Sequence, residues 1–230
     1  MRSIVFDMSD MHEHGSAFYN FLRLRKRLFV DELSWSIPTD GVVEMDQYDT
    51  PLAFYSLVEE DGKILAGARC QPILAEWGAH SSMAVDASRG LIDGIPPRLF
   101  EGLTIKPGMW EGTRLVISDD VRSMTKRTQC LALVIDGLLR TIIAYGGNAL
   151  LTISPTTLQR AAKLAGLRPV QIGEPYICAS DDREYGVFVS EAVRAFDRLE
   201  ELGLNVDGIE IVSPRQANGG MIDRTGLLKY

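Results

Sequence analysis

Apolar residues recur along this chain at two spacings, one typical of helices and the other of strands. A helical spacing runs over about residues 16–31, with apolar side chains mostly on one side and basic ones on the other. The clearest helix is predicted from Thr125 to Tyr145, where leucine and isoleucine recur at i, i+3 and i+4. Shorter helices are predicted at 155–167 and 191–202, with proline near the start and glycine near the end of the first.

Short apolar runs bounded by turn residues predict the strands. Residues 52–58 and 63–72 flank an Asp61-Gly62 pair, which strongly favours a β-hairpin turn. Gly67 within the second strand indicates a bulge or a close approach of another segment. Further strands are predicted at 3–6, 109–118, 150–153, 170–172 and 184–190, and residues 76–106 are predicted to be irregular with short helices.

The order of these elements predicts the fold class. A β-hairpin comes early, and helices alternate with strands after it. This order favours an α/β fold, a three-layer α-β-α sandwich with a mixed sheet. We expect a single domain over residues 1–211, followed by a loose tail at 212–230 that is rich in Gly, Asn, Ser and Arg.

Composition excludes several classes of protein. With 230 residues and a net charge of −7, the chain lacks the basic balance of a general nucleic-acid-binding protein. The most apolar helix contains Asp136 and Arg140, so no membrane span is expected. Three widely spaced cysteines form neither a disulfide framework nor a CxxC metal site, and no secretory signal is visible. A cytoplasmic protein is expected.

Charged residues gather in places where they need partners. Three carboxylates lie within Glu44–Asp49, and Arg69, Glu111 and Arg114 lie in strands predicted to be buried. An unpaired buried ion costs several kcal/mol, so acids and arginines are expected to satisfy one another. Such a group suggests a site for a polar, zwitterionic substrate. A solvated acidic turn and a purely structural ion-pair network are the alternatives.

Known site motifs limit the choices further. A calcium loop counted from Glu44 would need Gly where Asp49 stands and Glu where Tyr55 stands. The histidines form no metal pattern, and neither GxGxxG nor a Walker A loop is present. Glu111 and Arg114 are three residues apart and would point to opposite faces of a strand unless it twists or bulges. Asp46, Asp49 and Arg69 are candidate partners for both.

Taken together, these positions resemble the acyl-homoserine-lactone synthases, the LuxI-type autoinducer synthases. That family shows an Arg-x-x-x-Phe pair, a Trp, an E-x-D-x-[YF]-D run, an Arg in a strand and an E-x-x-R pair. All of them occur here in order over about residues 20–120, as Arg25 and Phe29, Trp35, Glu44–Asp49, Arg69, and Glu111 with Arg114.

The resemblance implies a fold like that of the GCN5-related N-acyltransferases. It implies two substrates, S-adenosylmethionine and an acyl thioester carried by acyl carrier protein or coenzyme A. The amine of S-adenosylmethionine would be acylated, and lactone closure would release methylthioadenosine to give a quorum-sensing signal. No cofactor and no metal are expected, because S-adenosylmethionine is consumed as a substrate.

The resemblance also assigns roles to residues. Glu111 is the expected base for the amine, with Asp46 second, while Arg69 and Arg114 orient the acids or meet the substrate carboxylate. The expected substrate-binding residues are Arg25, Phe29, Trp35, Asp49, Thr113 and Thr152. Thr152 falls near a threonine that the family uses in 3-oxo-acyl producers. Glu44 is expected to be structural.

The apolar stripe of the long helix, over about residues 131–142, is either an acyl-chain tunnel or simply core. Two other functions remain open. A GCN5-type N-acyltransferase acting on another amine would need a glycine-containing phosphate loop, but the junction at 119–124 lacks glycine. A non-catalytic sensor of S-adenosylmethionine or thioester is the other.

Overall fold

The structure is a computed structural model and describes residues 1–204. The predicted tail at 212–230 and the end of the predicted domain at 205–211 lie outside the described residues. Seven strands of the described part join one sheet in the order β1-β2-β3-β4-β5-β7-β6. The β4–β5 pair is parallel and the other pairs are antiparallel, so the predicted mixed sheet is confirmed.

The strands are β1 Arg2–Asp7, β2 Phe54–Glu60, β3 Lys63–Pro72, β4 Met109–Ile117, β5 Ala149–Pro155, β6 Val170–Ile177 and β7 Glu184–Glu191. The α-helices are α1 Ala17–Arg25, α2 Met83–Ser88, α3 Met124–Ala144, α4 Leu158–Leu164 and α5 Phe196–Glu201. Two 3-10 helices, η1 Met11–His14 and η3 Pro97–Phe100, and a π-helix, η2 Lys26–Glu32, complete the described elements.

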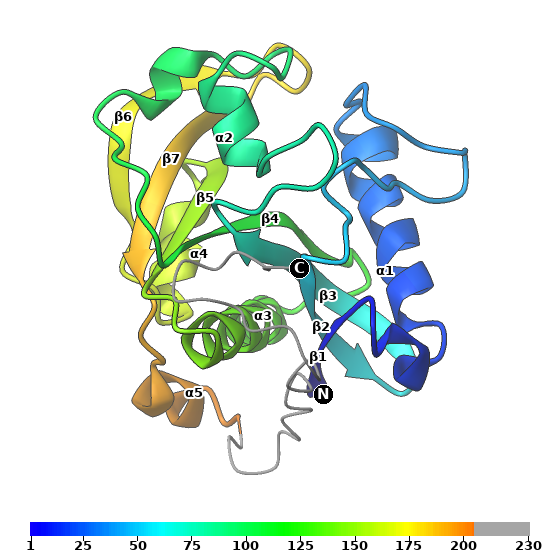
Figure 1. Cartoon of the computed structure of the whole chain (residues 1–230). Coiled ribbons are helices and arrows are strands. Elements are labelled where there is room, and N and C mark those ends of the chain that lie inside the picture. Colours follow the sequence, from blue (N-terminus) through cyan, green and yellow to red (C-terminus); the bar gives the residue numbers. More distant parts are fainter. Residues whose placement is uncertain (205–230) are drawn as a thin grey trace.

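Helices cover both faces of the sheet, which confirms the predicted three layers (Figure 1). The long helix α3 packs against one face, with α4 and α5 beside it. On the other face, α1 covers the strands at the β1 end, and α2 with η3 covers β5, β7 and β6. The apolar stripe of α3 is buried in the core cluster on its own face.

The hairpin is formed as predicted. Asp61 and Gly62 both have positive φ, 52° and 76°, as a tight two-residue hairpin turn requires. A Cβ at Gly67 would overlap Leu57 and lie 2.7 Å from the Phe21 ring, so glycine allows α1 to approach the sheet closely. The register of β3 against β4 also shifts between Gly67 and Arg69.

Three predicted boundaries were wrong, each for a local reason. The α4 helix begins at Leu158, because Pro155 is still paired with Tyr185 in the sheet. The predicted helix start at Glu191 is wrong because Glu191 still belongs to β7, where it pairs with Ala149, and α5 begins at Phe196 after a short connection. The β6 strand reaches Ile177 instead of ending at 172, and a register shift interrupts its pairing with β7.

The parallel pair β4–β5 has a feature that positions the site. Pairing covers Met109–Gly112 against Ala149–Thr152, although both strands continue beyond these residues. The two strands therefore separate near the middle of the sheet, and each leaves backbone groups unpaired with the other.

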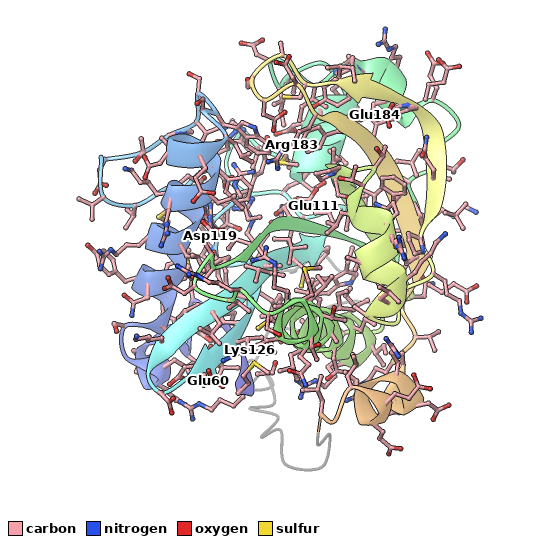
Figure 2. All side chains as sticks on the ribbon, turned by 180° about the vertical axis from the view of Figure 1, so that it is seen from behind. Glu60, Glu111, Asp119, Lys126, Arg183 and Glu184 are labelled. Carbon is pink, nitrogen blue, oxygen red and sulfur yellow. The ribbon has the colours of Figure 1, made fainter. Side chains whose placement is uncertain are left out.

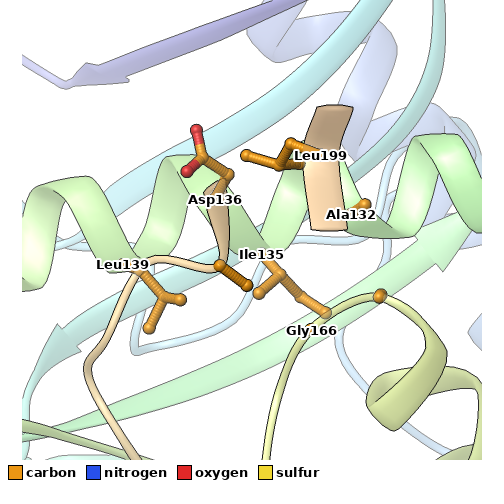
Figure 3. Close-up of a pocket in the computed structure, with 8 residues that line it drawn as sticks. Ala132, Ile135, Asp136, Leu139, Gly166 and Leu199 are labelled. Atoms are coloured by element: carbon orange, nitrogen blue, oxygen red, sulfur yellow. The ribbon is translucent and has the colours of Figure 1, made fainter. Parts of the chain in front are cut away.

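The α3 face carries a small apolar cavity between α3, the turn after α4 and α5 (Figure 3). The Asp136 carboxylate at its edge pairs with Arg140 and Arg194 at 3.0 and 2.7 Å. Within residues 1–204, no helix is both long and apolar enough to cross a membrane.

Candidate active site

The acidic run lies in the loop before β2, and the structure buries all three of its carboxylates. The loop folds partly around its own acids. The Asp46 backbone N–H donates to Asp49 Oδ2 at 2.9 Å, and the Tyr48 N–H donates to Asp46 Oδ1 at 2.9 Å. Aspartates commonly close turns in this way. The solvated-turn alternative is therefore wrong.

Arg25, at the end of α1, donates to two of the acids. Its Nε lies 2.6 Å from Glu44 Oε2, and its Nη1 and Nη2 lie 2.8 and 2.9 Å from the two Asp49 oxygens. The helix widens into the π-helix η2 directly after Arg25. Such π-segments are frequent at functional sites because they redirect side chains. Arg25 thus fastens α1 to the acidic loop.

Arg69 comes from β3 and is fully buried. Its Nη1 and Nη2 donate to Asp46 at 2.5 and 3.1 Å, and its Nη1 lies 2.9 Å from Asp49 Oδ1. Its Nε donates to Thr113 Oγ1 at 3.1 Å. Tyr55, opposite Arg69 on β2, donates its hydroxyl to Asp49 at 3.0 Å.

Arg114 reaches the same acids because β4 bulges. Its φ is +57°, which is unusual for a residue other than glycine, and β4 carries one extra residue against β3 at this point. Thr113 and Arg114 therefore both reach the face that carries Arg69. The Arg114 Nη2 lies 2.7 Å from Asp46 Oδ2, and its Nε lies 3.3 Å from Glu44 Oε1.

The result is a buried cluster of three carboxylates and three guanidinium groups, formed by Glu44, Asp46, Asp49, Arg25, Arg69 and Arg114. We call it the acid–arginine cluster. Burial by itself raises the pKa of Asp46, but Arg69 and Arg114 more than offset it and leave the pKa lowered. Asp46 therefore stays ionised and holds protons poorly. The cluster is most exposed at Arg114, whose side chain is 8% accessible.

Glu111 lies outside this cluster, in the interior of the molecule (Figure 2). Its Oε1 accepts from Gln71 Nε2 at 2.8 Å and from the Met83 N–H at 3.0 Å. Its Oε2 accepts from the Ala84 N–H at 2.8 Å. Its partners are therefore Gln71 and the first turn of α2, and not Asp46, Asp49 or Arg69 as the sequence had suggested.

The environment of Glu111 sets its proton affinity. Full burial raises its pKa, and the hydrogen bonds from Ala84 and Gln71 only partly offset this. Glu111 therefore binds a proton more readily than Asp46 does. Arg69, Gln71 and Glu111 share one face of the sheet, because Gln71 follows Arg69 by two residues and pairs with Glu111.

The expected aromatic segment lies against the acid–arginine cluster. The rings of Phe29 and Trp35 stack at 5.0 Å, and the Arg114 guanidinium lies over Phe29 at 5.4 Å. Trp35 also donates from Nε1 to Asp181 Oδ2 at 3.0 Å. Arg25, Phe29 and Trp35 are therefore connected to the other expected residues in space.

Thr152 stands apart from the cluster. It pairs with Gly112 at the last position before β4 and β5 separate. A Cβ at Gly112 would contact Leu150 and Thr152, which places Thr152 on the α3 face of the sheet. Glu111 faces α2, so Thr152 is beside the gap between the strands but on the opposite face.

Several residues that complete the site were missed from the sequence. Tyr55 lies opposite Arg69 only because a bulge between Val58 and Glu59 shifts the hairpin register by one residue, which the turn residues do not indicate. Gln71 pairs with Glu111 across β3 and β4, whose register the hairpin turn does not set. Tyr48 donates its hydroxyl to Asp86 of α2 at 3.0 Å, and Asp181 accepts from Trp35. No local pattern indicates these two long-range contacts.

Comparisons with known proteins agree with the arrangement. The family model for autoinducer synthases matches residues 9–187. An acyl-homoserine-lactone synthase of Acinetobacter nosocomialis is 25% identical over 166 residues, covering 69% of this chain and 84% of that protein. One of Pseudomonas chlororaphis is 28% identical over 155 residues, covering 66% and 69%.

Solved structures share the fold. The CoA-dependent acyl-homoserine lactone synthase BjaI, with SAM and isopentyl-CoA, matches at a TM-score of 0.69 with 19% identity, covering 87% of this chain and 88% of that chain. The same protein with MTA matches at 0.70. LasI, another AHL synthase, matches at 0.66 with 16% identity, covering 86% and 94%.

Proposed function

The chain belongs to the autoinducer synthase family, and we propose that it acylates the amine of S-adenosylmethionine from an acyl thioester and closes the product to a homoserine lactone. One observation carries the proposal. A buried carboxylate with a raised pKa, Glu111, lies on the same sheet face as the acid–arginine cluster, at the point where β4 and β5 separate.

Glu111 is the proposed base. The substrate amine must lose a proton before it attacks the thioester, and a base works best when its pKa approaches the working pH. Burial moves the pKa of Glu111 in that direction, whereas the arginines move that of Asp46 away from it. The proton passes to Glu111 directly or through one water. Asp46 thereby becomes a binding and positioning residue.

Two bond exchanges complete the reaction. The amine nitrogen bonds to the acyl carbon as the C–S bond of the thioester breaks and the carrier thiol leaves. The methionine carboxylate then bonds to its own γ-carbon as the C–S bond of the sulfonium breaks, which releases methylthioadenosine. Neither step needs a covalent enzyme intermediate, an oxidant or a metal.

The rim of the acid–arginine cluster suits the zwitterionic end of S-adenosylmethionine. Arg114 presents a guanidinium group for the carboxylate, and Asp46 beside it attracts the ammonium group. The ring of Trp35, which is partly exposed and stacked on the buried Phe29, favours a nearby sulfonium cation. Arg25, Arg69 and Asp49 are more deeply buried and hold this surface in place.

The acyl donor is assigned to the gap between β4 and β5. Acyl carrier protein and coenzyme A both present a phosphopantetheine arm with amide groups, and unpaired strand edges bind such groups well. The acyl tail is assigned to the apolar cluster beneath α2 and η3. Ala84 connects this cluster to the proposed base, because its side chain packs in the cluster and its backbone N–H donates to Glu111. The α3 stripe is core.

A GCN5-type N-acyltransferase acting on another amine is less well supported. Its phosphate loop would precede α3, where exposed Asp119 and Asp120 stand instead of glycines. Negative side chains next to a helix N-terminus oppose binding of a diphosphate. The bound SAM and isopentyl-CoA of a solved protein with the same fold support the proposed pair of substrate classes.

A donor panel tests this function. Purified protein is incubated with S-adenosylmethionine and acyl-CoA or acyl-carrier-protein donors of several chain lengths, and products are followed by mass spectrometry. A lactone from at least one donor is expected. Acylation of other amines without lactone would support the GCN5-type alternative, and substrate binding without turnover would support a sensor.

A further inference from the structure

Asp181, in the turn between β6 and β7, accepts hydrogen bonds from one residue far away in the sequence and from two nearby residues. Trp35 Nε1 donates to Asp181 Oδ2 at 3.0 Å across 146 residues, and Tyr185 Oη donates to the same oxygen at 2.7 Å. The Arg183 N–H donates to Asp181 Oδ1 at 3.1 Å. Figure 2 marks this turn by Arg183 and Glu184.

The contact joins the turn to the acid–arginine cluster through a row of rings. Trp35 lies 6.1 Å from the Tyr185 ring and stacks on Phe29, and the Arg114 guanidinium lies over Phe29. Asp181 therefore stands at one end of a continuous set of contacts and Arg114 at the other.

The indole of Trp35 is held by ring contacts with Phe29 and Tyr185 and by its hydrogen bond to Asp181. Its neighbours Ser34 and Ser36 are exposed, and Ser34 has a φ of +56°. The Trp35 backbone N–H bonds to Phe29 O, but this contact leaves the side chain free to rotate. The hydrogen bond to Asp181 adds a directional contact at the indole N–H, which ring packing alone does not provide.

The charge on Asp181 strengthens this contact. Burial raises the pKa of Asp181, but hydrogen bonds from Tyr185 and Trp35 lower it by more, so the carboxylate is ionised at neutral pH. Hydrogen bonds to an ionised acceptor are stronger than those between neutral groups. The bond from Trp35 to Asp181 therefore stabilises the position of the indole more than a bond to a neutral acceptor would.

We propose that Asp181 is a positioning residue for the acceptor substrate, which fixes Trp35, and Phe29 beneath it, in the orientation that receives S-adenosylmethionine. The inference rests on the proposed function. It assigns to the β6–β7 turn a part in acceptor binding, although this turn lies far in sequence from the acidic run and from Glu111. Tyr185 supports Asp181 from within β7.

Kinetics of Asp181→Ala test the proposal. We expect the KM for S-adenosylmethionine to rise about tenfold, equivalent to about 1.4 kcal/mol, while kcat and the KM for the acyl donor stay within about twofold. Asp182→Asn, one position along the same turn, is the matched control and should resemble the wild type. Tyr185→Phe keeps the turn and should raise the same KM by about threefold.

A double-mutant cycle separates positioning from general support of the turn. In a Trp35→Phe background the indole N–H is gone, so Asp181→Ala should change the KM by less than twofold. A tenfold effect in that background, or an unchanged KM in the single variant, would overturn the proposal.

A binding-independent measurement distinguishes failure of this inference from failure of the proposed function. Trp77→Phe leaves Trp35 and the buried Trp110 as the only indoles. In that background, Asp181→Ala should roughly double quenching of tryptophan emission by acrylamide. Unchanged quenching would refute the positioning role of Asp181 even if the enzyme is active. Wild-type protein that makes no lactone instead refutes the function alone.

Discussion

Replacing Asp49 by Asn is the most informative test of the acid–arginine cluster. The Asp49 carboxylate accepts from Arg25 at 2.8 and 2.9 Å, from the Tyr55 hydroxyl at 3.0 Å and from the Asp46 N–H at 2.9 Å. Arg69 Nη1 lies 2.9 Å from the same group. Asn keeps the size of the side chain, but it removes the negative charge and one acceptor.

The size of the effect follows from the charge balance. Three carboxylates and three guanidinium groups cancel in the wild type, whereas Asp49→Asn leaves the buried cluster with one net positive charge and takes a carboxylate from Arg25 and Arg69. Breaking a buried ion pair from one side costs about 3–5 kcal/mol. Because whole domains are stable by only about 5–15 kcal/mol, the variant should lose a large part of its stability.

Urea unfolding followed by circular dichroism measures this loss. With a slope of about 3 kcal/mol per molar urea, the midpoint should fall by on the order of 1 M at pH 7. Asp61→Asn is the control, because Asp61 lies in the exposed hairpin turn at a φ of 52° that Asn adopts readily. The control should keep the wild-type midpoint. An Asp49→Asn midpoint equal to that of the control would refute the reasoning.

The pH dependence of stability gives an independent check of the direction in which the pKa of Asp49 is shifted. Burial raises the pKa of Asp49, but Arg69 and Arg25 lower it further, so the folded-state pKa is below the unfolded value. Such a group stabilises the fold above its unfolded pKa of about 3.9, and the stabilisation is lost as the pH falls. The stability gap between wild type and Asp49→Asn should therefore narrow below about pH 4.

Three other variants test the catalytic base, the packing and the donor site. Glu111→Gln should lower kcat by about 10²–10⁴ with S-adenosylmethionine affinity within threefold, and a near-normal kcat would restrict Glu111 to anchoring α2. Gly67→Ala forces a Cβ against Leu57 and Phe21 and should lower the free energy of unfolding by about 1–3 kcal/mol. An unchanged melting temperature would contradict the close approach of α1 to the sheet. Thr152 lies on the α3 face, opposite the assigned acyl site, so Thr152→Val should leave the preference for 3-oxo over unsubstituted acyl donors within about twofold. A larger change in the kcat/KM ratio would place the acyl tail on the α3 face instead.

Much of the fold could be predicted because its signals are local. The Asp61-Gly62 turn specifies the hairpin, and the period of the α3 helix specifies its buried stripe. Boundaries that depend on pairing were missed. Pro155 and Glu191 carry helix-like context but belong to strands, because β5 and β7 pair through them.

The sequence indicated which residues come together at the candidate site better than it indicated the hydrogen-bond partners of each one. Charges in buried strands must find partners, so the pairing of Arg69 and Arg114 with the acidic run followed from charge, whereas Arg25 was expected only from the family resemblance. The partners of Glu111 could not be found in this way, since they are backbone amides of a short helix 27 and 28 residues away. Asp181 was likewise missed, because no local sequence pattern indicates a contact between residues 146 positions apart.

The most direct test of the account is the stoichiometry of the reaction. Purified protein is given S-adenosylmethionine and its preferred acyl donor, and methylthioadenosine and lactone are quantified together by mass spectrometry. The account predicts that both products form in equal amounts and only when both substrates are present. Acyl transfer without methylthioadenosine, or methylthioadenosine without an acyl donor, would contradict it.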